Sequence, residues 1–368
     1  WGAWWSAYTQ NPTEGDRYRL DLRTSNAFST RFMPGIFVAY GTLDHRWKSG
    51  LNVRFILRKS PRTEAYFEIK RDVEQFGMNG LLDQGEAFTS LLRTGSIVPL
   101  SEVVRAEASI LHEFGKGFSG FVEGRHRRVA AIGDWDFRNP LNGSPLDQLI
   151  TTELTGILRY AFQERFVSGE FDRISLGTEW PILTGTATWG LPGVLGSQYN
   201  YLRCTIDAED VARIGLAGRL EWLAQAGKYW GSAPFPLMEV VAASGTYFMT
   251  PESFNLLNPL ELVTDQWLKS SLEWHLEGFV LNHIPWLRRI GLREVIGVKT
   301  ILGSWDPKHE ELVALSDGTN GLLAPYTECS LGIENIFRFI RIDAVWRTDR
   351  ELGIDNSWGI RVGFAVEI

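Results

Sequence analysis

The sequence predicts a membrane-spanning, antiparallel up-and-down β-barrel of about sixteen strands, with fourteen as the alternative count. Three observations predict this all-β fold. Apolar and polar residues alternate with a period of two along most of the 368-residue chain. Many alternating segments hold ten or more residues, which is enough to cross a bilayer at a tilt. The connections between the segments alternate between short and long, as in a barrel with one plain and one decorated end.

Each segment separates a charged face from an apolar face. In residues 17–23, RYRLDLR, charged side chains occupy the odd positions and Tyr and Leu the even ones. Residues 51–58, 64–70, 268–277 and 340–347 follow the same pattern. The candidates for a polar face that lines the lumen are Arg17, Arg19, Asp21, Arg23, Arg54, Glu68, Glu273, His275, Arg341 and Asp343.

The pattern places sixteen strands along the chain, and it is weakest in residues 31–42 and 170–179, which keeps a count of fourteen open. The expected strands are residues 3–9, 16–25, 31–42, 48–58, 62–72, 101–113, 118–131, 149–163, 170–179, 195–208, 211–227, 264–279, 291–304, 325–334, 337–347 and 357–368.

The connections divide into two classes. The short ones are residues 26–30, 59–61, 114–117, 164–169, 209–210 and 335–336. The long ones are residues 73–100, 132–148, 180–194, 228–263 and 305–324. Residues 280–290 are longer than the other plain-end connections, and we expect them to form a small plug or collar there.

The polar face carries both signs of charge, which suits a solvated lumen with ion pairs. A soluble β-sandwich of this length would use Greek-key connections, without the alternation of short and long ones. We therefore expect the apolar face to contact lipid, and the sheet to close because hydrocarbon offers no partner for unpaired backbone groups. The interfacial aromatic girdles are expected at Trp4, Trp5, Trp47, Trp180, Trp222, Trp274 and Trp346, with Trp267 packed inside.

Composition excludes several classes of protein. The net charge of −7 argues against a nucleic-acid-binding protein. No run of about 18 apolar residues is present, so a membrane-spanning helix is excluded. The chain begins with Trp1 and has no signal peptide, so we expect one barrel domain (residues 1–368) trimmed from a longer protein. Cys204 and Cys329 are expected to act as small apolar side chains rather than as a disulfide.

No catalytic, cofactor or metal motif is recognisable. The six histidines are dispersed, and Asp134 and Asp136 in a long connection are more simply explained as solvated acids than as a catalytic pair. His275 falls on the polar face between two glutamates, where a structural hydrogen bond is the simplest role. The basic run GRHRRV (residues 124–129) fits either contact with lipopolysaccharide phosphates or a plain solvated strand end.

The final octapeptide, RVGFAVEI, matches the targeting strand of outer-membrane barrels. Its polar, glycine and two apolar positions are filled by Arg361, Gly363, Val366 and Ile368. We expect the strand at residues 357–368 to pair with the strand at residues 3–9 and close the cylinder. In that pairing, Phe364 and Val366 would face lipid, and Arg361 and Glu367 the lumen.

Residues 11–51, 254–304 and 325–347 resemble the carboxyl-terminal barrel of an uncharacterised family of Gram-negative outer-membrane proteins. Members of that family carry an amino-terminal carboxypeptidase-regulatory-like domain, which is expected upstream of this chain. The barrel is also distantly similar to the surface-antigen superfamily of BamA and TamA, which insert or translocate proteins. This resemblance implies sixteen strands, both termini in the periplasm, and an outer-membrane location. Residues 228–263 depart from the superfamily because they lack its Arg-Gly pair.

The expected function is non-enzymatic: the membrane part of a protein assembly, translocation or export system. A gated or passive solute channel and a docking barrel for surface or periplasmic proteins are the alternatives. The expected partners are outer-membrane lipid and lipopolysaccharide, the barrel-assembly machinery that inserts the chain, and unidentified proteins, with no nucleic acid and no cofactor.

Overall fold

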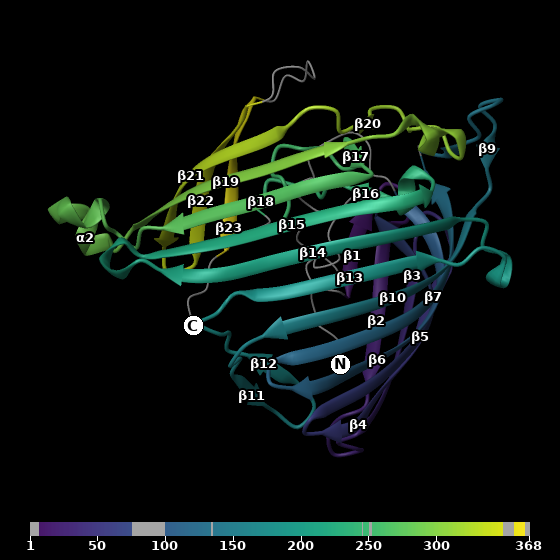
Figure 1. Cartoon of the computed structure of the whole chain (residues 1–368), viewed down its shortest axis with the longest axis horizontal. Helices are drawn as coiled ribbons and strands as arrows, with labels where there is room; N and C mark the ends of the chain where they lie inside the picture. The colour runs from purple at the N-terminus through teal and green to yellow at the C-terminus, as the bar shows by residue number, and fades with distance from the viewer. Residues whose placement is uncertain are drawn as a thin grey trace.

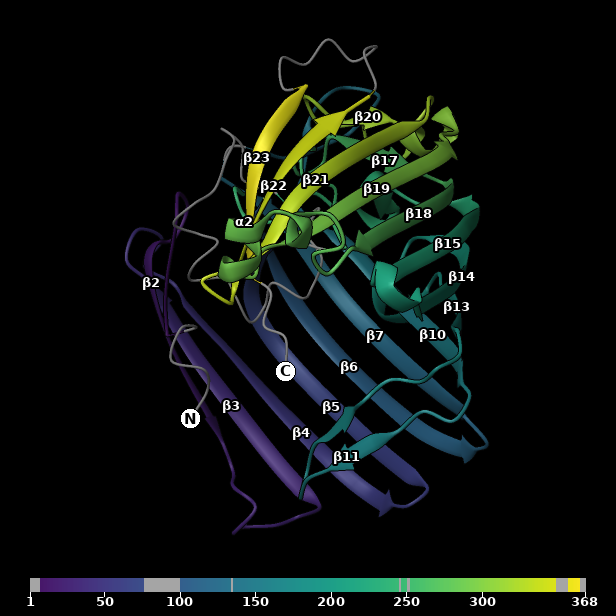
Figure 2. The same ribbon diagram turned by 90° about the vertical axis from the view of Figure 1, so that its left-hand side faces the viewer.

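The computed structural model describes residues 7–75, 100–133, 135–244, 246–249, 252–348 and 357–364. Sixteen antiparallel strands, paired in chain order, form one sheet that curls into a barrel (Figures 1 and 2), which confirms the predicted fold and count. The strands are β1 (Tyr8–Asn11), β2 (Gly15–Arg23), β3 (Phe32–Gly41), β4 (Trp47–Lys59), β5 (Arg62–Gln75), β6 (Leu100–Gly115), β7 (Phe118–Ile132), β10 (Leu149–Ala161), β13 (Ile182–Gly190), β14 (Asn200–Arg213), β15 (Arg219–Ser232), β18 (Gln266–His275), β19 (Arg293–Ser304), β21 (Tyr326–Ile336), β22 (Ile340–Arg347) and β23 (Trp358–Phe364).

The connections hold the remaining elements. Their strands form three small sheets: β8 (Phe137–Arg138) with β9 (Pro145–Leu146), β11 (Phe166–Ser168) with β12 (Arg173–Ser175), and β16 (Glu239–Val240) with β17 (Leu262–Thr264) and β20 (Asn320–Gly321). The helical turns are η3 (Val194–Gly196), η4 (Gly215–Ala217), η5 (Phe235–Leu237), η6 (Leu281–His283), α2 (Pro285–Ile290) and η7 (Pro307–Glu311). Within the described ranges, none of the helices has the length and apolar content needed to span a bilayer.

Burial in this sheet is the reverse of burial in a soluble protein. Leu20 and Ile206 are 52% and 67% exposed, whereas Arg17 and Asp343 are 4% and 0% exposed. The charged face is concave, because Arg17 of β2 reaches across β3 and β4 to pair with Asp72 of β5 at 2.7 Å. An apolar outer surface of this extent is favourable only where the surroundings are apolar too.

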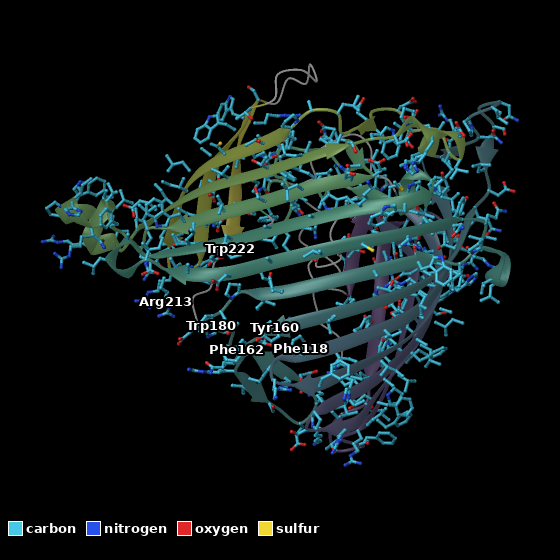
Figure 3. All side chains as sticks on the ribbon, viewed as in Figure 1. Phe118, Tyr160, Phe162, Trp180, Arg213 and Trp222 are labelled. Carbon is cyan, nitrogen blue, oxygen red and sulfur yellow. The ribbon has the colours of Figure 1, made fainter. Side chains whose placement is uncertain are left out.

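Aromatic side chains mark the two ends of the apolar band. Phe118, Tyr160, Phe162, Trp180 and Trp222 lie along the end of the strands to which α2 is attached (Figure 3). Toward the other end, the partly exposed side chains include Trp47, Trp189, Trp230, Trp346 and Trp358. On β15, Trp222 and Trp230 are separated by roughly 27 Å along the strand, or about 20 Å of height at a tilt of ~40°. This height is close to that of the apolar band of outer-membrane barrels.

The predicted ninth strand, residues 170–179, is wrong. The ninth strand of the sheet is β13 at residues 182–190, and residues 162–181 form a connection that carries the hairpin β11–β12. Residues 170–179 contain three charged residues before Gly177, which adopts a φ of +80° that ends an extended run. Small residues and threonine in β13, ILTGTATWG, concealed its alternation.

This error displaced its neighbours along the chain. The strands expected at residues 195–208 and 211–227 are β14 and β15: β14 begins and ends five residues later, and β15 begins eight and ends five residues later. The connection between β13 and β14 is therefore short, residues 191–199, rather than the expected long one at 180–194. Two connections at the plain end are therefore long: residues 162–181 and residues 276–292.

We expect Ile206→Arg to lower the free energy of unfolding in phospholipid vesicles by about 2–4 kcal/mol, because it places a charge at the bilayer midplane. Ile206 lies on β14 midway between Leu202 and Asp210, which pair with Trp230 and Trp222. Urea unfolding followed by tryptophan fluorescence measures the change.

Leu216→Arg is the matched control, because Leu216 is 94% exposed in the turn between β14 and β15. Its effect should stay within about 0.5 kcal/mol. Equal stabilities of the wild type and the Ile206→Arg variant would contradict a lipid-facing outer surface.

Candidate functional site

The lumen contains the described part of the connection between β15 and β18 (residues 233–244, 246–249 and 252–265), which we call the plug. It contains η5, β16 and β17. Phe235, Ala243, Phe254 and Val263 are all 0% exposed, so its apolar side chains form a core inside the barrel. The plug also pairs with β20 from the next long connection, which makes a small three-stranded sheet in the lumen. The plug and β20 thus fill part of the lumen with a packed core.

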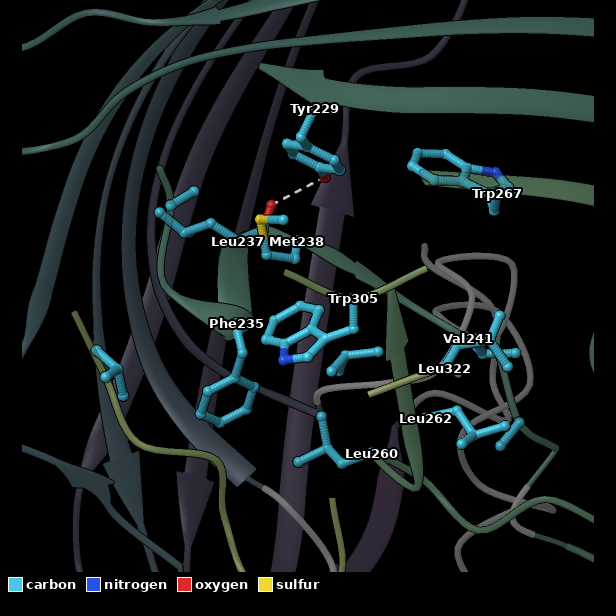
Figure 4. Close-up of a cluster of buried hydrophobic side chains, with 14 of the residues drawn as sticks. Tyr229, Phe235, Leu237, Met238, Val241, Leu260, Leu262, Trp267, Trp305 and Leu322 are labelled. Atoms are coloured by element: carbon cyan, nitrogen blue, oxygen red, sulfur yellow. Dashed lines mark hydrogen bonds between the residues drawn. The ribbon is translucent and has the colours of Figure 1, made fainter. Parts of the chain in front are cut away.

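An aromatic wall faces the apolar part of the plug. The ring centroids of Tyr229 and Trp267 lie 5.9 Å apart, and the hydroxyl of Tyr229 donates a hydrogen bond to the carbonyl of Leu237 at 3.0 Å (Figure 4). Trp267 is 3% exposed, in agreement with its predicted place inside the barrel. Its indole nitrogen donates to the side-chain oxygen of Gln225 at 3.0 Å. Apolar burial and polar pairing therefore hold the same face of the plug.

Charged side chains of the wall hold the plug backbone. The carboxylate of Glu328 accepts hydrogen bonds from the amides of Asn255 and Leu256 at 2.7 and 2.8 Å. The ammonium of Lys299 donates to the carbonyl of Ser253 at 2.9 Å. Glu328 and Lys299 are 2% and 7% exposed, so these are buried, charge-assisted bonds. We call Glu328 and Lys299 the clamp.

Two arginines also link the plug to the last two strands of the sheet. The Nε of Arg361 on β23 donates to the carbonyl of Asn255 at 2.8 Å. Arg347 on β22 forms an ion pair with Glu261 of the plug at 3.2 Å, and both side chains are 3% exposed. Removing one member of such a pair leaves a buried charge without its partner, which typically costs about 3–5 kcal/mol. The plug is therefore bound tightly on the side of β19 to β23.

Beyond the plug, the lumen wall carries separate ion-pair networks. Arg17, predicted to face the lumen, is buried and contacts Glu14 and Asp72. Arg19 pairs with Asp21 at 2.8 Å on the same strand, and both are partly buried. Glu14 also accepts an ion pair from Lys48 at 2.6 Å. Arg23 lies exposed at the end of β2. Of the predicted residues of β2, Arg17, Arg19 and Asp21 thus belong to one ion-pair network, and Arg23 lies at the strand end.

Arg54 and Glu68 occupy the next part of the wall. Arg54 pairs with Asp172, in the turn between β11 and β12, at 3.0 Å. Glu68 accepts an ion pair from Arg105 at 2.6 Å. These contacts tie the plain-end hairpin and the neighbouring strand to the interior of the barrel.

The remaining predicted residues meet in one cluster near the α2 end. The imidazole of His275 lies between Glu273 and Glu334, with Nε2 and Nδ1 each 3.0 Å from a carboxylate oxygen. Arg341 pairs with Asp343 at 2.7 Å and also with Glu273 on β18, across β19 and β21. The sequence predicted the polar parity of these residues. Their convergence depends on the curvature of the sheet.

This cluster also contains a possible set of metal ligands. Atoms of Glu221, Glu273 and His275 lie within 4.8 Å of one another. Each of the three is already engaged: Glu273 with Arg341, Glu221 with Arg219 at 3.0 Å, and His275 with Glu334. The geometry is that of an ion-pair network along the lumen face of several strands, and we assign no metal ion to it.

The two edge strands of the sheet, β1 and β23, form no pair with each other in the described part of the chain. The predicted closing ladder is therefore not observed there. Residues 1–6 and 365–368, which include Val366, Glu367 and Ile368, lie outside the described residues. A barrel that is closed by a continuous ladder requires its two edge strands to pair with each other along their length. The described β1 has only four residues, and all four pair with β2.

The plug covers part of the free edge of β23. Phe248 forms an isolated parallel bridge with Val362. The amide of Met249 donates to the carbonyl of Val362 at 2.8 Å, and the amide of Val362 donates to the carbonyl of Tyr247 at 3.0 Å. The ring of Phe248 lies 5.6 Å from that of Phe364. We call residues 246–249 the edge segment. No strand of the described residues pairs with this edge of β23, and the edge segment supplies backbone partners there.

Two members of the proposed targeting strand are described. Arg361 points toward the plug through its bond to Asn255, and Gly363 is buried beside Arg341. Phe364 is 64% exposed, on the outer face. These orientations match those expected for the last strand, and the targeting role remains a prediction.

The basic run at residues 124–129 does not form one outward patch. Arg125 pairs with Glu123 at 2.7 Å, and Arg127 pairs with Glu153 at 3.2 Å, both on the lumen face of β7. His126 contacts the hydroxyl of Thr152, and Arg128 is exposed. Since alternation turns successive residues to opposite faces, Arg128 remains as the exposed arginine of this run.

Sequence reasoning missed the clamp. Lys299 is the single charge in VIGVKTILG, and Glu328 is the single charge in PYTECSLG. Each lies on the polar parity of its strand, opposite apolar neighbours. The signal available in the sequence was an isolated charge at a lumen-facing position, among residues that are otherwise small, polar or apolar. Their common partner, residues 253–256, is an irregular segment whose position no periodicity could predict.

Comparison with solved structures finds a barrel of similar fold. BamA from Haemophilus ducreyi lacking POTRA domains 1–3 is similar in structure with a TM-score of 0.58 at 9% sequence identity, over 96% of this chain and 67% of that chain. CdiB from Acinetobacter baumannii and CdiB from Escherichia coli both give a TM-score of 0.48, at 10% and 11% identity. Both matches cover 96% of this chain but only 57% and 60% of the CdiB chains. At such low identity, the BamA likeness shows the fold alone.

The sequence itself matches one family. No protein with a curated description matches the chain. Residues 135–314, from the connection after β7 to the connection after β19, match the family described as "Family of unknown function (DUF5686) C-terminal domain". This range includes the plug and Lys299. The middle of the chain is therefore similar to the C-terminal domain of the DUF5686 family, and the sixteen-stranded barrel around it has a fold similar to that of BamA.

Proposed function

We propose that the chain is an outer-membrane β-barrel of a Gram-negative bacterium that forms the membrane part of a protein assembly, translocation or export system. The observation that carries this proposal is a lumen filled by a clamped plug beside two edge strands that do not pair with each other in the described residues. A filled lumen blocks solutes, whereas a free strand edge can bind an extended polypeptide.

The membrane location is supported by the distribution of side chains. The outer face is apolar, aromatic residues mark both of its ends, and the charges lie inside in ion pairs. The likeness to BamA supports a barrel of the same architecture. The plain end, which holds the first residue of β1 and the last of β23, is assigned to the periplasm.

The edge strands support a role with polypeptides. β1 and β23 have four and seven described residues, whereas β6 and β7 on the opposite wall have 16 and 15. An unpaired backbone group costs several kcal/mol in hydrocarbon, so a free edge in the membrane favours any strand that can pair with it. The edge segment satisfies β23 at Val362. A client strand could extend this pairing along the rest of β23 or add to β1.

A non-enzymatic role follows from how the titratable groups are used. His275 and the carboxylates around it are held in mutual ion pairs, and the clamp residues bind the plug backbone.

A gated solute channel is the second candidate. Glu68, Arg105, Glu107 and Arg125 form a charged stretch of wall, with contacts of 2.6–3.4 Å, that would line a water-filled path if the plug moved away. A structural docking barrel is the third, and it would use the same rigid wall without movement of the plug.

Photo-cross-linking in cells separates these functions. Benzoylphenylalanine at Tyr8 on β1 or Ile360 on β23 should form adducts with newly synthesised outer-membrane proteins, because both side chains are exposed on the edge strands. The matched control is Leu158, which is similarly exposed on β10 in the opposite wall. Pulse-labelled adducts are measured on gels.

Adducts at all three positions, or at none, would contradict a role of the strand edges in polypeptide binding. A stable adduct with one resident protein, unchanged by a chase, would instead favour the docking barrel.

Conductance in planar bilayers tests the closed lumen. Wild-type protein should give little steady current, and replacing residues 237–262 by a short Gly-Ser linker should open a stable conductance. Glu328→Gln should raise the frequency of openings, because a neutral amide accepts weaker hydrogen bonds from Asn255 and Leu256.

The control is Glu170→Gln, which changes an exposed ion pair with Lys59 at the plain end. Heat-modifiable migration on gels verifies that each variant is folded. A steady wild-type conductance that plug replacement leaves unchanged would contradict the proposal and favour a passive channel.

A further inference from the structure

The connection between β18 and β19 presents an unusual exposed apolar surface at the plain end. Its residues 279–290, which contain η6 and α2, are called the collar segment. Phe279, Val280, Ile284, Trp286 and Ile290 are between 39% and 64% exposed. The collar segment projects outward from the ends of β18 and β19, away from the barrel wall (Figure 1). It therefore leaves five large apolar side chains in contact with the surroundings of the barrel.

The conformation of the collar segment is fixed by the strands beneath it. The carboxylate of Glu294 on β19 accepts hydrogen bonds from the amides of Gly278 and Val280, both at 3.0 Å, and from that of Leu281. The side chain of Asn335 on β21 donates to the carbonyl of Gly291 at 2.7 Å, just after α2. A six-residue helix is too short to be stable alone, so these bonds hold it in place. Its exposed apolar side chains are thus presented by a built structure.

The charges of the collar segment lie beside this apolar surface. Trp286 and Ile290 are four residues apart and share one face of α2, whereas Arg288 lies on the opposite face and Arg289 beside Ile290. Both arginines are exposed, and neither guanidinium is in an ion pair within the described ranges. The chain carries a net charge of −7, so this pair of free cations runs against its overall charge. Such an arrangement is typical of helices that lie in a membrane interface.

The position of the collar segment continues the aromatic girdle. On β7 to β15, the girdle at this end is formed by Phe118, Tyr160, Phe162, Trp180 and Trp222 (Figure 3). The adjacent turn between β21 and β22 exposes Phe337 and Phe339, at 79% and 46%, with Arg338 between them. In strand order, the collar segment lies between these two groups, because it joins β18 to β19 at the same end of the barrel. Its exposed apolar side chains therefore belong to the same end of the barrel as the girdle.

We propose that the collar segment is an interfacial lipid anchor in the periplasmic leaflet. Trp286 and Ile290 lie at the boundary between headgroups and acyl chains, and Arg288 and Arg289 bind the phosphates of anionic phospholipids. This inference rests on the proposed outer-membrane location. It adds a fixed lipid contact to the connection between β18 and β19, two strands whose lumen faces carry His275 and the clamp residue Lys299.

Quenching of a site-specific fluorophore by lipid tests the anchor. The full chain, with Cys204→Ala and Cys329→Ala, is labelled with an environment-sensitive dye at Trp286→Cys and reconstituted in phosphatidylethanolamine–phosphatidylglycerol vesicles. Phospholipids brominated near the headgroup should quench this dye several-fold more strongly than those brominated near the chain ends. A dye at Ile206→Cys should show the opposite preference, and a dye at Leu141→Cys, which replaces a side chain that is 93% exposed at the other end, should not be quenched.

The outcomes separate the two proposals. Quenching at residue 206 but not at residue 286 overturns the lipid anchor and leaves the membrane barrel intact, since the collar segment then faces water or protein. Absence of quenching at both positions overturns the membrane barrel itself.

The role of the arginines has a separate readout. At equal mole fraction, brominated phosphatidylglycerol should quench the dye at residue 286 about two- to five-fold more than brominated phosphatidylcholine. Arg288→Gln with Arg289→Gln should abolish this preference while depth-dependent quenching persists. A preference that survives both substitutions overturns the assignment of phosphate binding to these arginines.

Discussion

Backbone pairing is the constraint on which the rest of this structure depends. A sheet that faces hydrocarbon must satisfy every peptide group within the protein, and fifteen successive antiparallel ladders do this for the interior of the sheet. The two edge strands are where the constraint is hardest to meet. At β23 the partner for Val362 comes from the plug, which reaches the edge through residues 246–249. The plug is therefore both a lumen filling and a partner of the sheet edge.

The same inversion of polarity explains how the plug is held. Because the apolar residues lie on the outer face, the charges lie on the lumen wall, and each buried charge needs a partner. Some of these partners are wall residues of the opposite sign, as in the cluster of His275, Glu273 and Arg341. The others are peptide groups of the plug, which bind Glu328, Lys299 and Arg361. The plug is held there because its peptide groups form hydrogen bonds with buried charges of the wall that water would otherwise have to hydrate.

Much of the fold could be predicted because alternation is a local property of each strand. Residues 17–23 show it plainly, since charge and apolar size coincide with the two faces. β13 could not be found in this way, because glycine, alanine and threonine distinguish the faces weakly. The site was less predictable. The polar parity of Glu273 and Arg341 was visible, but their contact across two strands depends on curvature. The clamp depends on the path of an irregular segment, which no period encodes.

Amide hydrogen exchange of the protein in lipid vesicles tests most directly whether wall charges hold the plug. The amides of Asn255 and Leu256, which donate to Glu328, should exchange as slowly as those of β21 and should become fast in the Glu328→Gln variant. Exchange of these two amides in the wild type at the rate of the exposed turn around Leu216 would contradict the account, because the plug would then be a loose loop without a fixed place in the lumen.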